Sequence, residues 1–305
     1  MTEAISLRAT ACAYCGTLGN AVQIYPANFE EQDFNPAVFS ARRLPDRLHY
    51  RMVRCRTCGL LRSDPVTEPE LLKRLYAQSV QTYDSELPNL RETYGKYLDV
   101  LDRFGAAKTR LLEVGCGSGF FLLEARLRGF QDVRGIEPSQ AAAAQAAPEL
   151  RSRIVCDVLR PGLFADSTFD VICMFQVFDH LPDPNSALET CLRMLRPGGL
   201  MLALNHDAGS FSARLLGERS PIIDIEHTYL YDVPSMQRML RKHDFEILQQ
   251  GSATNLYSLQ YLVQLLPLPH PVKAASMRLL QRTGFGRVRL RAALGNLYII
   301  ARRPA

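Results

Sequence analysis

Long apolar runs and a targeting leader are both missing from this sequence. No stretch reaches about eighteen continuous apolar residues, the minimum for a membrane-spanning helix. The first residues, MTEAISLRATACAYCG, contain no basic region followed by an apolar run, which is the pattern of a secretory signal. Internal repeats and low-complexity tracts are missing too. We therefore expect a globular cytoplasmic protein without a membrane span.

A strong excess of one charge is also missing. The 305 residues contain 36 Lys and Arg against 31 Asp and Glu, a net charge of +5, which is too small by itself to indicate nucleic-acid binding. Apolar residues make up 47% of the chain, enough for one large domain and a smaller one. Basic residues gather near the end, where either solvated helix faces or a phosphate- or RNA-binding face would explain them: Arg278, Arg282, Arg287, Arg289, Arg291, Arg302 and Arg303.

Four of the eight cysteines form two Cys-x2-Cys pairs, and each pair is followed by glycine. Thiols stay reduced in the cytoplasm, and two such pairs are typical of four thiolates around one tetrahedral zinc ion. Redox cysteines or unliganded core cysteines are the alternatives. A four-thiolate site is closed, so its zinc is structural. The expected ligands are Cys12, Cys15, Cys55 and Cys58, while Cys116, Cys156, Cys173 and Cys191 are expected in the core.

Strand and helix patterns alternate through the middle of the chain. Such alternation predicts a parallel sheet with helices on both faces, and the nearly all-apolar stretch 169–177 is typical of its central strand. We predict helices over 71–80 and 90–104, strands over 110–115, 132–138, 153–158, 169–177 and 200–205, helices over 120–129, 139–147 and 185–195, and late strands over 245–250 and 296–303.

The glycine-rich turn in LLEVGCGSGFFL follows the first of these strands. Its glycines are Gly115, Gly117 and Gly119, and Phe120 stands where a dinucleotide fingerprint would have its third glycine. Glu113 lies inside the strand, and its carboxylate would repel a pyrophosphate but attract an ammonium group. The turn therefore predicts a ligand with an amino-acid end and no phosphates, unless its glycines serve only tight backbone packing.

At this turn the sequence resembles the class I S-adenosylmethionine-dependent methyltransferases. The resemblance continues, in order, over roughly residues 106–206. Its further matches are Gly135-Ile136-Glu137-Pro138-Ser139, Cys156-Asp157-Val158, Phe169-Asp170-Val171-Ile172, Phe178-Asp179-His180-Leu181 and Leu195-Arg196-Pro197-Gly198-Gly199.

This resemblance implies a Rossmann-like α/β fold that binds S-adenosylmethionine. The turn with Glu113 would hold the methionine end, Glu137 would accept the ribose hydroxyls, and Asp157 would take the adenine amino group. The expected cofactor site also includes Pro138, Val158 and Gln176. The alternatives are a surface acid for Glu137 and a helix or turn cap for Asp157.

A four-cysteine module before such a core resembles bacterial enzymes that methylate sugars, glycans or natural products, among them nucleotide-sugar C-methyltransferases. The segment NHDAGSFSARLLGER and residues 224–230 also look like this group and would overhang the transferred methyl group. We therefore predict a zinc-ribbon module over 1–66, a helical linker over 67–105 and a methyltransferase domain over 106–305, in which 207–290 covers the acceptor and supplies the C-terminal helices.

Histidines are the expected general bases. Methyl transfer from a sulfonium mainly needs alignment of the reacting atoms, and an oxygen or carbon acid must also lose a proton, for which histidine is suited. We rank His227 first, then His180 and His206, because all three follow strands at the edge where ligands bind. A structural hydrogen-bonding role is the alternative for each.

Acids and tyrosines near these histidines are further candidates. Asp224 and Glu226 would orient His227 or bind acceptor hydroxyls, and Asp179 would assist His180. Tyr229 and Tyr231 would line the pocket or belong to the core.

The sequence as a whole predicts a methyltransferase that uses S-adenosylmethionine and acts on an oxygen or carbon of a small-molecule, sugar, glycan or natural-product acceptor. Two alternatives remain open. One is an RNA methyltransferase that docks through the ribbon and the C-terminal arginines. The other is a non-catalytic partner that binds the cofactor within a biosynthetic complex. The sequence indicates neither the acceptor nor the oligomeric state.

Overall fold

A seven-stranded, mostly parallel sheet forms the centre of the protein. The computed structural model describes residues 5–39, 46–79, 86–266 and 268–305. The strand order is β12-β15-β10-β9-β6-β7-β8, and β15 alone runs antiparallel, between β10 and β12. The strands are β6 (Arg110–Val114), β7 (Asp132–Ile136), β8 (Ile154–Val155), β9 (Phe169–Phe175), β10 (Leu195–His206), β12 (Glu246–Ser252) and β15 (Asn296–Arg302). The predicted Rossmann-like α/β class is confirmed.

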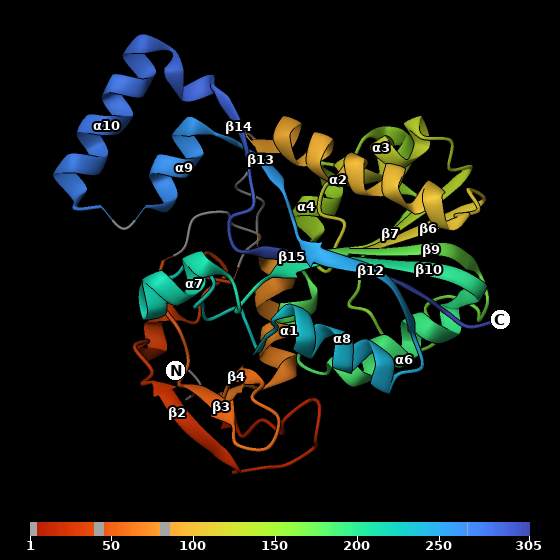
Figure 1. Cartoon of the computed structure of the whole chain (residues 1–305), viewed down its shortest axis with the longest axis horizontal. Helices are drawn as coiled ribbons and strands as arrows, with labels where there is room; N and C mark the ends of the chain where they lie inside the picture. The colour runs from red at the N-terminus through yellow and green to blue at the C-terminus, as the bar shows by residue number, and fades with distance from the viewer. Residues whose placement is uncertain (1–4, 40–45, 80–85, 267) are drawn as a thin grey trace.

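Helices cover both faces of this sheet (Figure 1). On one face lie α2 (Leu87–Leu101), α3 (Phe120–Leu127) and α4 (Gln140–Ala144), and on the other lie α6 (Pro184–Met194) and α8 (Val233–Lys242). Two separate layers of buried apolar side chains result, one on each face. The strand β9 is buried along its whole length, as its apolar sequence predicts. A short helix α5 (Pro148–Arg151) precedes β8.

The N-terminal module is completed by a strand from far along the chain. Its four-stranded sheet has the order β11-β4-β3-β2, with β2 (Ala21–Tyr25), β3 (Met52–Cys55), β4 (Leu61–Ser63) and β11 (Tyr229–Leu230). A second pair joins β1 (Leu7–Arg8) to β5 (Val66–Thr67), and α1 (Pro69–Gln78) comes next in the chain. The pairing of β4 with β11 ties the module to the segment that contains His227.

A helical excursion separates β12 from β15. It contains β13 (Asn255–Ser258), α9 (Leu259–Leu265), α10 (His270–Thr283) and β14 (Arg289–Ala292), and Figure 1 shows α9 and α10 projecting from the body at the upper left. The remaining helix is α7 (Phe211–Leu216), and short 3-10 turns are η1 (Glu31–Asp33), η3 (Asp102–Phe104), η4 (Phe178–His180), η5 (Gly217–Arg219) and η6 (Phe285–Arg287). No helix among the described residues is long and apolar enough to span a bilayer.

Most of the predicted elements form, and the differences are local. The helix predicted over 139–147 is shorter, although Ser139 caps α4 by accepting a hydrogen bond from Ala142 N. The strand predicted over 153–158 shrinks to β8 because it lies at the sheet edge, where β7 is its one partner. The expectation of a buried Cys156 is wrong, since this residue comes directly after β8 and is exposed. His270 is the first residue of α10.

Candidate active site

A cavity of about 740 Å³ opens at the carboxyl ends of the parallel strands. It is the place where an open parallel sheet binds ligands, because adjacent loops diverge there. Every predicted cofactor residue except Gly117 and Gly119 lines it, as do all three predicted bases. The lining also includes residues that sequence reasoning missed, such as Lys73 and Tyr76 from α1 and Tyr257 and Tyr261 from the excursion.

The glycine turn approaches its neighbours too closely for side chains. Gly115 has a φ of +72°, and a Cβ atom there would lie 2.4 Å from Cγ2 of Val177. Both Gly115 N and Cys116 N donate hydrogen bonds to the carbonyl oxygen of Ile136. Gly119 also has a positive φ, at the N-cap of α3. The glycines therefore permit a backbone path that leaves the cavity wall open beside β6.

Glu113 places a buried carboxyl group in this wall. Its side chain contributes to the cavity lining, and its Oε2 atom has no hydrogen-bond partner among the described residues. Burial raises the pKa of Glu113 well above its usual value, and the nearby Glu137 raises it further. A buried carboxyl without a partner favours a cationic or hydrogen-bond-donating ligand group, which would stabilise its ionised form.

Glu137 holds the glycine turn as well as facing the cavity. Its Oε2 accepts a hydrogen bond from Gly117 N and its Oε1 accepts one from Ser139 N, each at 2.8 Å. Burial raises the pKa of Glu137, and these two backbone donors oppose the rise. Each carboxylate oxygen can accept more than one hydrogen bond, so the side chain can also receive donors from a ligand.

Asp157 lies at the cavity wall with both oxygens already paired. Its Oδ1 is 3.1 Å from Nζ of Lys73 on α1, and its Oδ2 accepts a hydrogen bond of 2.8 Å from Arg160. Burial acts to raise the pKa of Asp157, but these two cations lower it below its usual value. The contact with Lys73 was not predicted, because it joins the helical segment before the sheet to the end of β8.

Gln176 adopts a strained backbone conformation at the end of β9. Its φ is +56°, in the left-handed region that non-glycine residues seldom occupy. Its Nε2 donates to Asn296 Oδ1 at 2.9 Å, and its buried Oε1 has no hydrogen-bond partner among the described residues. The strain turns a polar side chain into the cavity wall, as such strain commonly does at functional sites.

Three histidines surround the carboxylate of Asp179, which is 1% exposed. His206 Nδ1 lies 2.6 Å from Oδ2, His227 Nε2 lies 3.9 Å from the same oxygen, and His180 Nε2 lies 3.7 Å from Oδ1. Burial opposes ionisation of Asp179, but the neighbouring His206 and His227 outweigh it and hold the pKa of this carboxyl well below its usual range. The cluster therefore combines one buried negative charge with imidazoles that face the cavity.

The environment of His227 favours its neutral form. Nδ1 lies 2.7 Å from the carbonyl oxygen of Ile222, so Nδ1–H donates and Nε2 is left as an acceptor. Burial lowers the pKa of His227 more strongly than Asp179 raises it. His180 contacts Tyr76 Oη through Nδ1 at 3.0 Å, and burial lowers its pKa to about 4. Near neutral pH, His227 can thus take up a proton at Nε2.

The N-terminal module fixes the main chain of His227. Ser63 Oγ donates a hydrogen bond of 2.7 Å to the carbonyl oxygen of His227, and Ser63 N donates one of 2.9 Å to that of Thr228. Thr228 N in turn donates to the carbonyl oxygen of Asp179. No local pattern around Ser63 indicates this role, because its partners are more than 160 residues away.

The other candidates divide between cavity and core. Asp224 and Glu226 both line the cavity, and Asp224 Oδ1 accepts a hydrogen bond from Glu226 N. Tyr229 and Tyr231 belong to the apolar core, and Tyr229 Oη donates to the carbonyl oxygen of Ala11. Of the two options left open for these tyrosines, the structure therefore supports the core.

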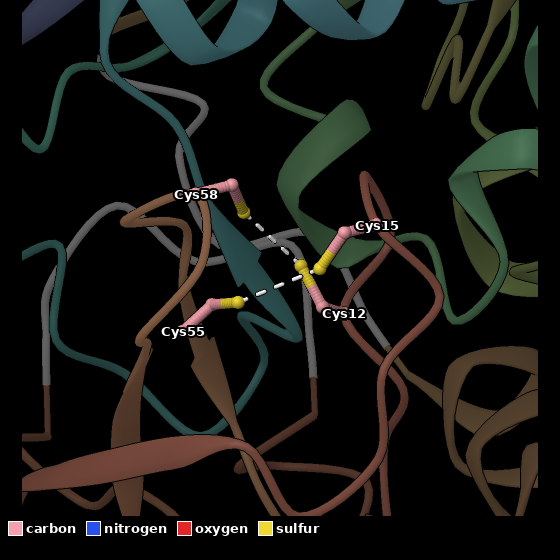
Figure 2. Close-up of side chains that lie close together, drawn as sticks. All are labelled: Cys12, Cys15, Cys55 and Cys58. Atoms are coloured by element: carbon pink, nitrogen blue, oxygen red, sulfur yellow. Dashed lines mark hydrogen bonds between the residues drawn. The ribbon is translucent and has the colours of Figure 1, made fainter.

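The four paired cysteines gather at one point of the N-terminal module (Figure 2). Their Sγ atoms lie within 4.8 Å of one another, with 3.3 Å between Cys12 and Cys58 and 3.5 Å between Cys15 and Cys55. Tetrahedral zinc–sulfur bonds of about 2.3 Å would place the sulfurs about 3.8 Å apart, so this donor set fits zinc. All four are free thiols, and backbone N–H donors near Cys55 outweigh its burial and lower its pKa to about 6.

The cluster of Asp179, His206 and His227 also offers three potential ligand atoms within 4.8 Å of one another. Two ligands of one divalent ion are separated by about 3 Å or more at ordinary bond lengths. The 2.6 Å between His206 and Asp179 is instead a hydrogen-bond distance. We therefore interpret this cluster as an acid–base group.

The central part of the chain is similar to known methyltransferases. A family model described as methyltransferase domain matches residues 89–250. The ubiquinone biosynthesis O-methyltransferase of Alkalilimnicola ehrlichii is 34% identical over 121 residues, 37% of this chain and 49% of the relative. That of Chromobacterium violaceum is 32% identical over 143 residues, 44% of this chain and 61% of the relative. The chain therefore spans about half to three fifths of the length of these relatives.

A solved structure is similar over a larger share of the chain. The YcgJ protein of Bacillus subtilis has a TM-score of 0.49 and 16% identity, covering 70% of this chain and 99% of that one.

The histidine cluster generates the first testable prediction. Replacing Asp179 by Asn removes the negative charge that favours the imidazolium forms, so the pKa values of His227 and His180 should fall further below their usual range. Histidine ring resonances measured by NMR from about pH 4 to 8 would report this shift. His243, whose pKa is lowered mainly by burial and by Lys242, is the internal control. Unchanged or raised values for His227 would contradict the proposed electrostatics.

Proposed function

Because the chain belongs to the methyltransferase domain family and has the fold of class I S-adenosylmethionine-dependent enzymes, we propose that it methylates a small-molecule acceptor. The observation that carries this proposal is the shared cavity, in which Glu113 and Glu137 lie on one side and the neutral His227 on another. Cofactor-type residues and a proton acceptor thus face the same space. The names of the relatives favour an oxygen acceptor over a carbon acceptor.

We infer that the predicted cofactor residues divide one ligand between them. The unpartnered Oε2 of Glu113 and the open turn at Gly115 suit the methionine end, and Glu137 suits the ribose hydroxyls. Asp157 and Val158 would border the adenine, while Pro138 and Gln176 would complete the wall. S-adenosylmethionine, when bound there, supplies an electrophilic methyl group on a sulfonium.

At the acceptor end, His227 would act as the general base. Its Nε2 takes the proton from the acceptor hydroxyl or carbon acid, the acceptor atom bonds to the methyl carbon, and the carbon–sulfur bond breaks with its electron pair left on sulfur. The buried charge of Asp179, 3.9 Å away, stabilises the imidazolium that forms. His206 donates to the same carboxylate and keeps it oriented, and His180, held by Tyr76, would border the reacting atoms.

Two alternatives receive less support. Relatives whose names specify a small-molecule O-methyltransferase do not favour RNA methylation or a non-catalytic role. Glycan acceptors remain within the proposed substrate class, since Asp224 and Glu226 supply carboxyl groups to the cavity wall that can accept hydroxyl hydrogen bonds.

We also propose that Cys12, Cys15, Cys55 and Cys58 hold a structural zinc ion. Their donor set is closed, and the strand that contains Cys55 leads into β4, whose Ser63 holds His227. The backbone of the first cysteine pair is also tied to the body, because Lys242 Nζ donates to the carbonyl oxygen of Ala13. Zinc would thus act on catalysis only through the position of His227.

The cofactor assignment predicts a loss of binding in Glu137→Ala. Wild-type protein should bind S-adenosylhomocysteine with micromolar affinity, about −8 kcal/mol, measured by calorimetric titration. The variant should bind at least about a hundredfold more weakly, because it loses the ribose acceptor and the support of the glycine turn. Glu149→Ala, an exposed acid on α5, is the matched control. Equal affinity of wild type and Glu137→Ala would refute the assignment.

The base assignment predicts that His227→Gln slows methyl transfer at least about a hundredfold, while S-adenosylhomocysteine affinity stays unchanged. The assay uses S-adenosylmethionine labelled in its methyl group and a panel of phenols, sugars and nucleotide sugars, with products identified by mass spectrometry. Because burial lowers the pKa of His227, wild-type turnover should persist somewhat below pH 6.5 and fall only at more acidic pH. His270→Gln, which changes an exposed residue at the start of α10, is the control. An undiminished rate of methyl transfer in His227→Gln would exclude His227 as the base.

The zinc assignment predicts one zinc ion per chain by elemental analysis and its loss in the double variant Cys55→Ser/Cys58→Ser. Methyl transfer should fall more than S-adenosylhomocysteine affinity, because Ser63 and His227 lose their alignment while the glycine turn is untouched. Cys156→Ser, which removes an exposed thiol outside the cluster, should retain zinc and activity. Full zinc content in the double variant would show that these thiols are not the ligands.

A further inference from the structure

The excursion between β12 and β15 has an unusual charge composition. We call its residues 259–295 the arm, which comprises α9, α10, η6 and β14. No aspartate or glutamate occurs anywhere from residue 247 to residue 305, so every charged side chain of the arm is cationic. These side chains are Lys273, Arg278, Arg282, Arg287, Arg289 and Arg291. Such a segment is attracted to an anionic surface as a unit.

The arm also exposes apolar side chains that a water-facing helix would avoid. The helix α10 contains no buried residue. On it Leu279 is 63% exposed and Val272 is 49% exposed, and these two are one heptad apart on the same face. At the turn after this helix, Phe285 is 62% exposed. Apolar and cationic side chains are thus interleaved along α10. This helix packs mainly against α9 and against the short turn η6 that follows it.

The charges at the two ends of the arm are used differently. Near its base, Arg289 and Arg291 both pair with Glu92 of α2, which anchors β14 to the body. Arg278, Arg282 and Arg287 form no ion pair with any residue in the described part of the chain. These three cations therefore remain available to an external anion, while the base of the arm is fixed.

The cavity opens beside this arm. Leu262 and Leu265 of α9, together with Leu294 at the end of the arm, line the cavity. On another element that lines it, α7, the outward side chains Phe211 and Leu215 are 80% and 70% exposed. Exposed apolar groups from two separate elements thus flank one opening.

We propose that the arm, with α7, docks on an anionic lipid surface and turns the cavity mouth toward the bilayer. Interfacial helices combine an apolar face with Lys and Arg, because apolar side chains enter the acyl boundary while cations contact lipid phosphates. The arm offers both, with no acid to repel the surface. An RNA-binding face would use its cations without needing exposed Leu and Phe side chains between them. A bilayer-dissolved acceptor would then reach the cavity directly, a consequence that rests on the proposed function.

The absence of tryptophan from the chain provides a direct test. Phe285→Trp places a single fluorescent probe at the turn after α10. Leu127→Trp places one at the last residue of α3, where Leu127 is 75% exposed and does not line the cavity. Each zinc-loaded variant is mixed with vesicles of phosphatidylcholine alone or with phosphatidylglycerol. The emission of Phe285→Trp should shift to shorter wavelength with the anionic vesicles and recover at high salt. Leu127→Trp should not shift.

Sedimentation with the same vesicles measures the affinity. The pair Leu279→Ser/Arg282→Gln should bind anionic vesicles at least tenfold more weakly than wild type, whereas Leu127→Ser/Arg126→Gln on α3 should bind like wild type. S-adenosylhomocysteine affinity checks that each variant is folded. The same measurement separates the cofactor proposal from the docking proposal. If wild type does not bind S-adenosylhomocysteine, the cofactor assignment is wrong, whereas vesicle binding tests the arm alone.

Three results would overturn the docking proposal. One is the failure of wild type to sediment with anionic vesicles, and another is undiminished binding by the folded arm variant. The third is a preference of wild type for a single-stranded RNA oligomer over anionic vesicles, with the loss of RNA binding in Leu279→Ser/Arg282→Gln. If the double variant does not fold, the tryptophan shift of Phe285→Trp alone decides the question.

Discussion

The pairing of β4 with β11 is the contact on which the geometry of the site depends. It joins a strand just after the second cysteine pair to a strand just after His227, and Ser63 donates hydrogen bonds to the two carbonyl groups that directly precede β11. The same segment reaches Asp179 through Thr228. A small N-terminal module of this kind could be taken for an appendage, but here it holds the main chain of His227, a residue that lines the cavity. The position of the proposed base therefore depends on hydrogen bonds from this module.

Buried carboxyl groups set the electrostatics of the cavity. Burial disfavours the ionised forms of both Glu113 and Glu137, and the charge of Glu137 further disfavours ionisation of Glu113. Asp179 lies in the opposite situation, because its imidazole neighbours hold it ionised. A cationic ligand group would thus stabilise the ionised carboxylates on the side of Glu113 and Glu137. On the other side, the negative charge of Asp179 lies behind the neutral imidazole of His227. In the proposed function, this division separates cofactor binding from proton transfer within one cavity.

The features that the sequence predicted are those with a local signal. A few consecutive residues are enough to indicate the glycine turn, each cysteine pair and the apolar strand β9. The order of such patterns along the chain predicts the fold class and the family. The contacts of Ser63 and of Lys73 could not be predicted, because each joins segments far apart in the chain. The exposed Cys156 was misjudged for a related reason: β8 is too short and too near the sheet edge to bury the residue directly after it. The sequence placed the three histidines at the same edge of the sheet, but it did not predict that all three would surround Asp179.

The excursion that contains the arm leaves and rejoins the central sheet at one place. In the register of β12 with β15, Ser252 lies opposite Leu297, so the whole segment between them begins and ends on adjacent strands. A tight hairpin turn could close the same gap and keep both strands paired. The pairing of these two strands therefore does not fix the length of the segment between them, and the arm lies outside the glycine turn and the strands that form the cofactor side of the cavity. In the proposed docking, the arm determines where the protein works, while residues at the ends of β6, β7 and β9 form the cofactor side of the cavity.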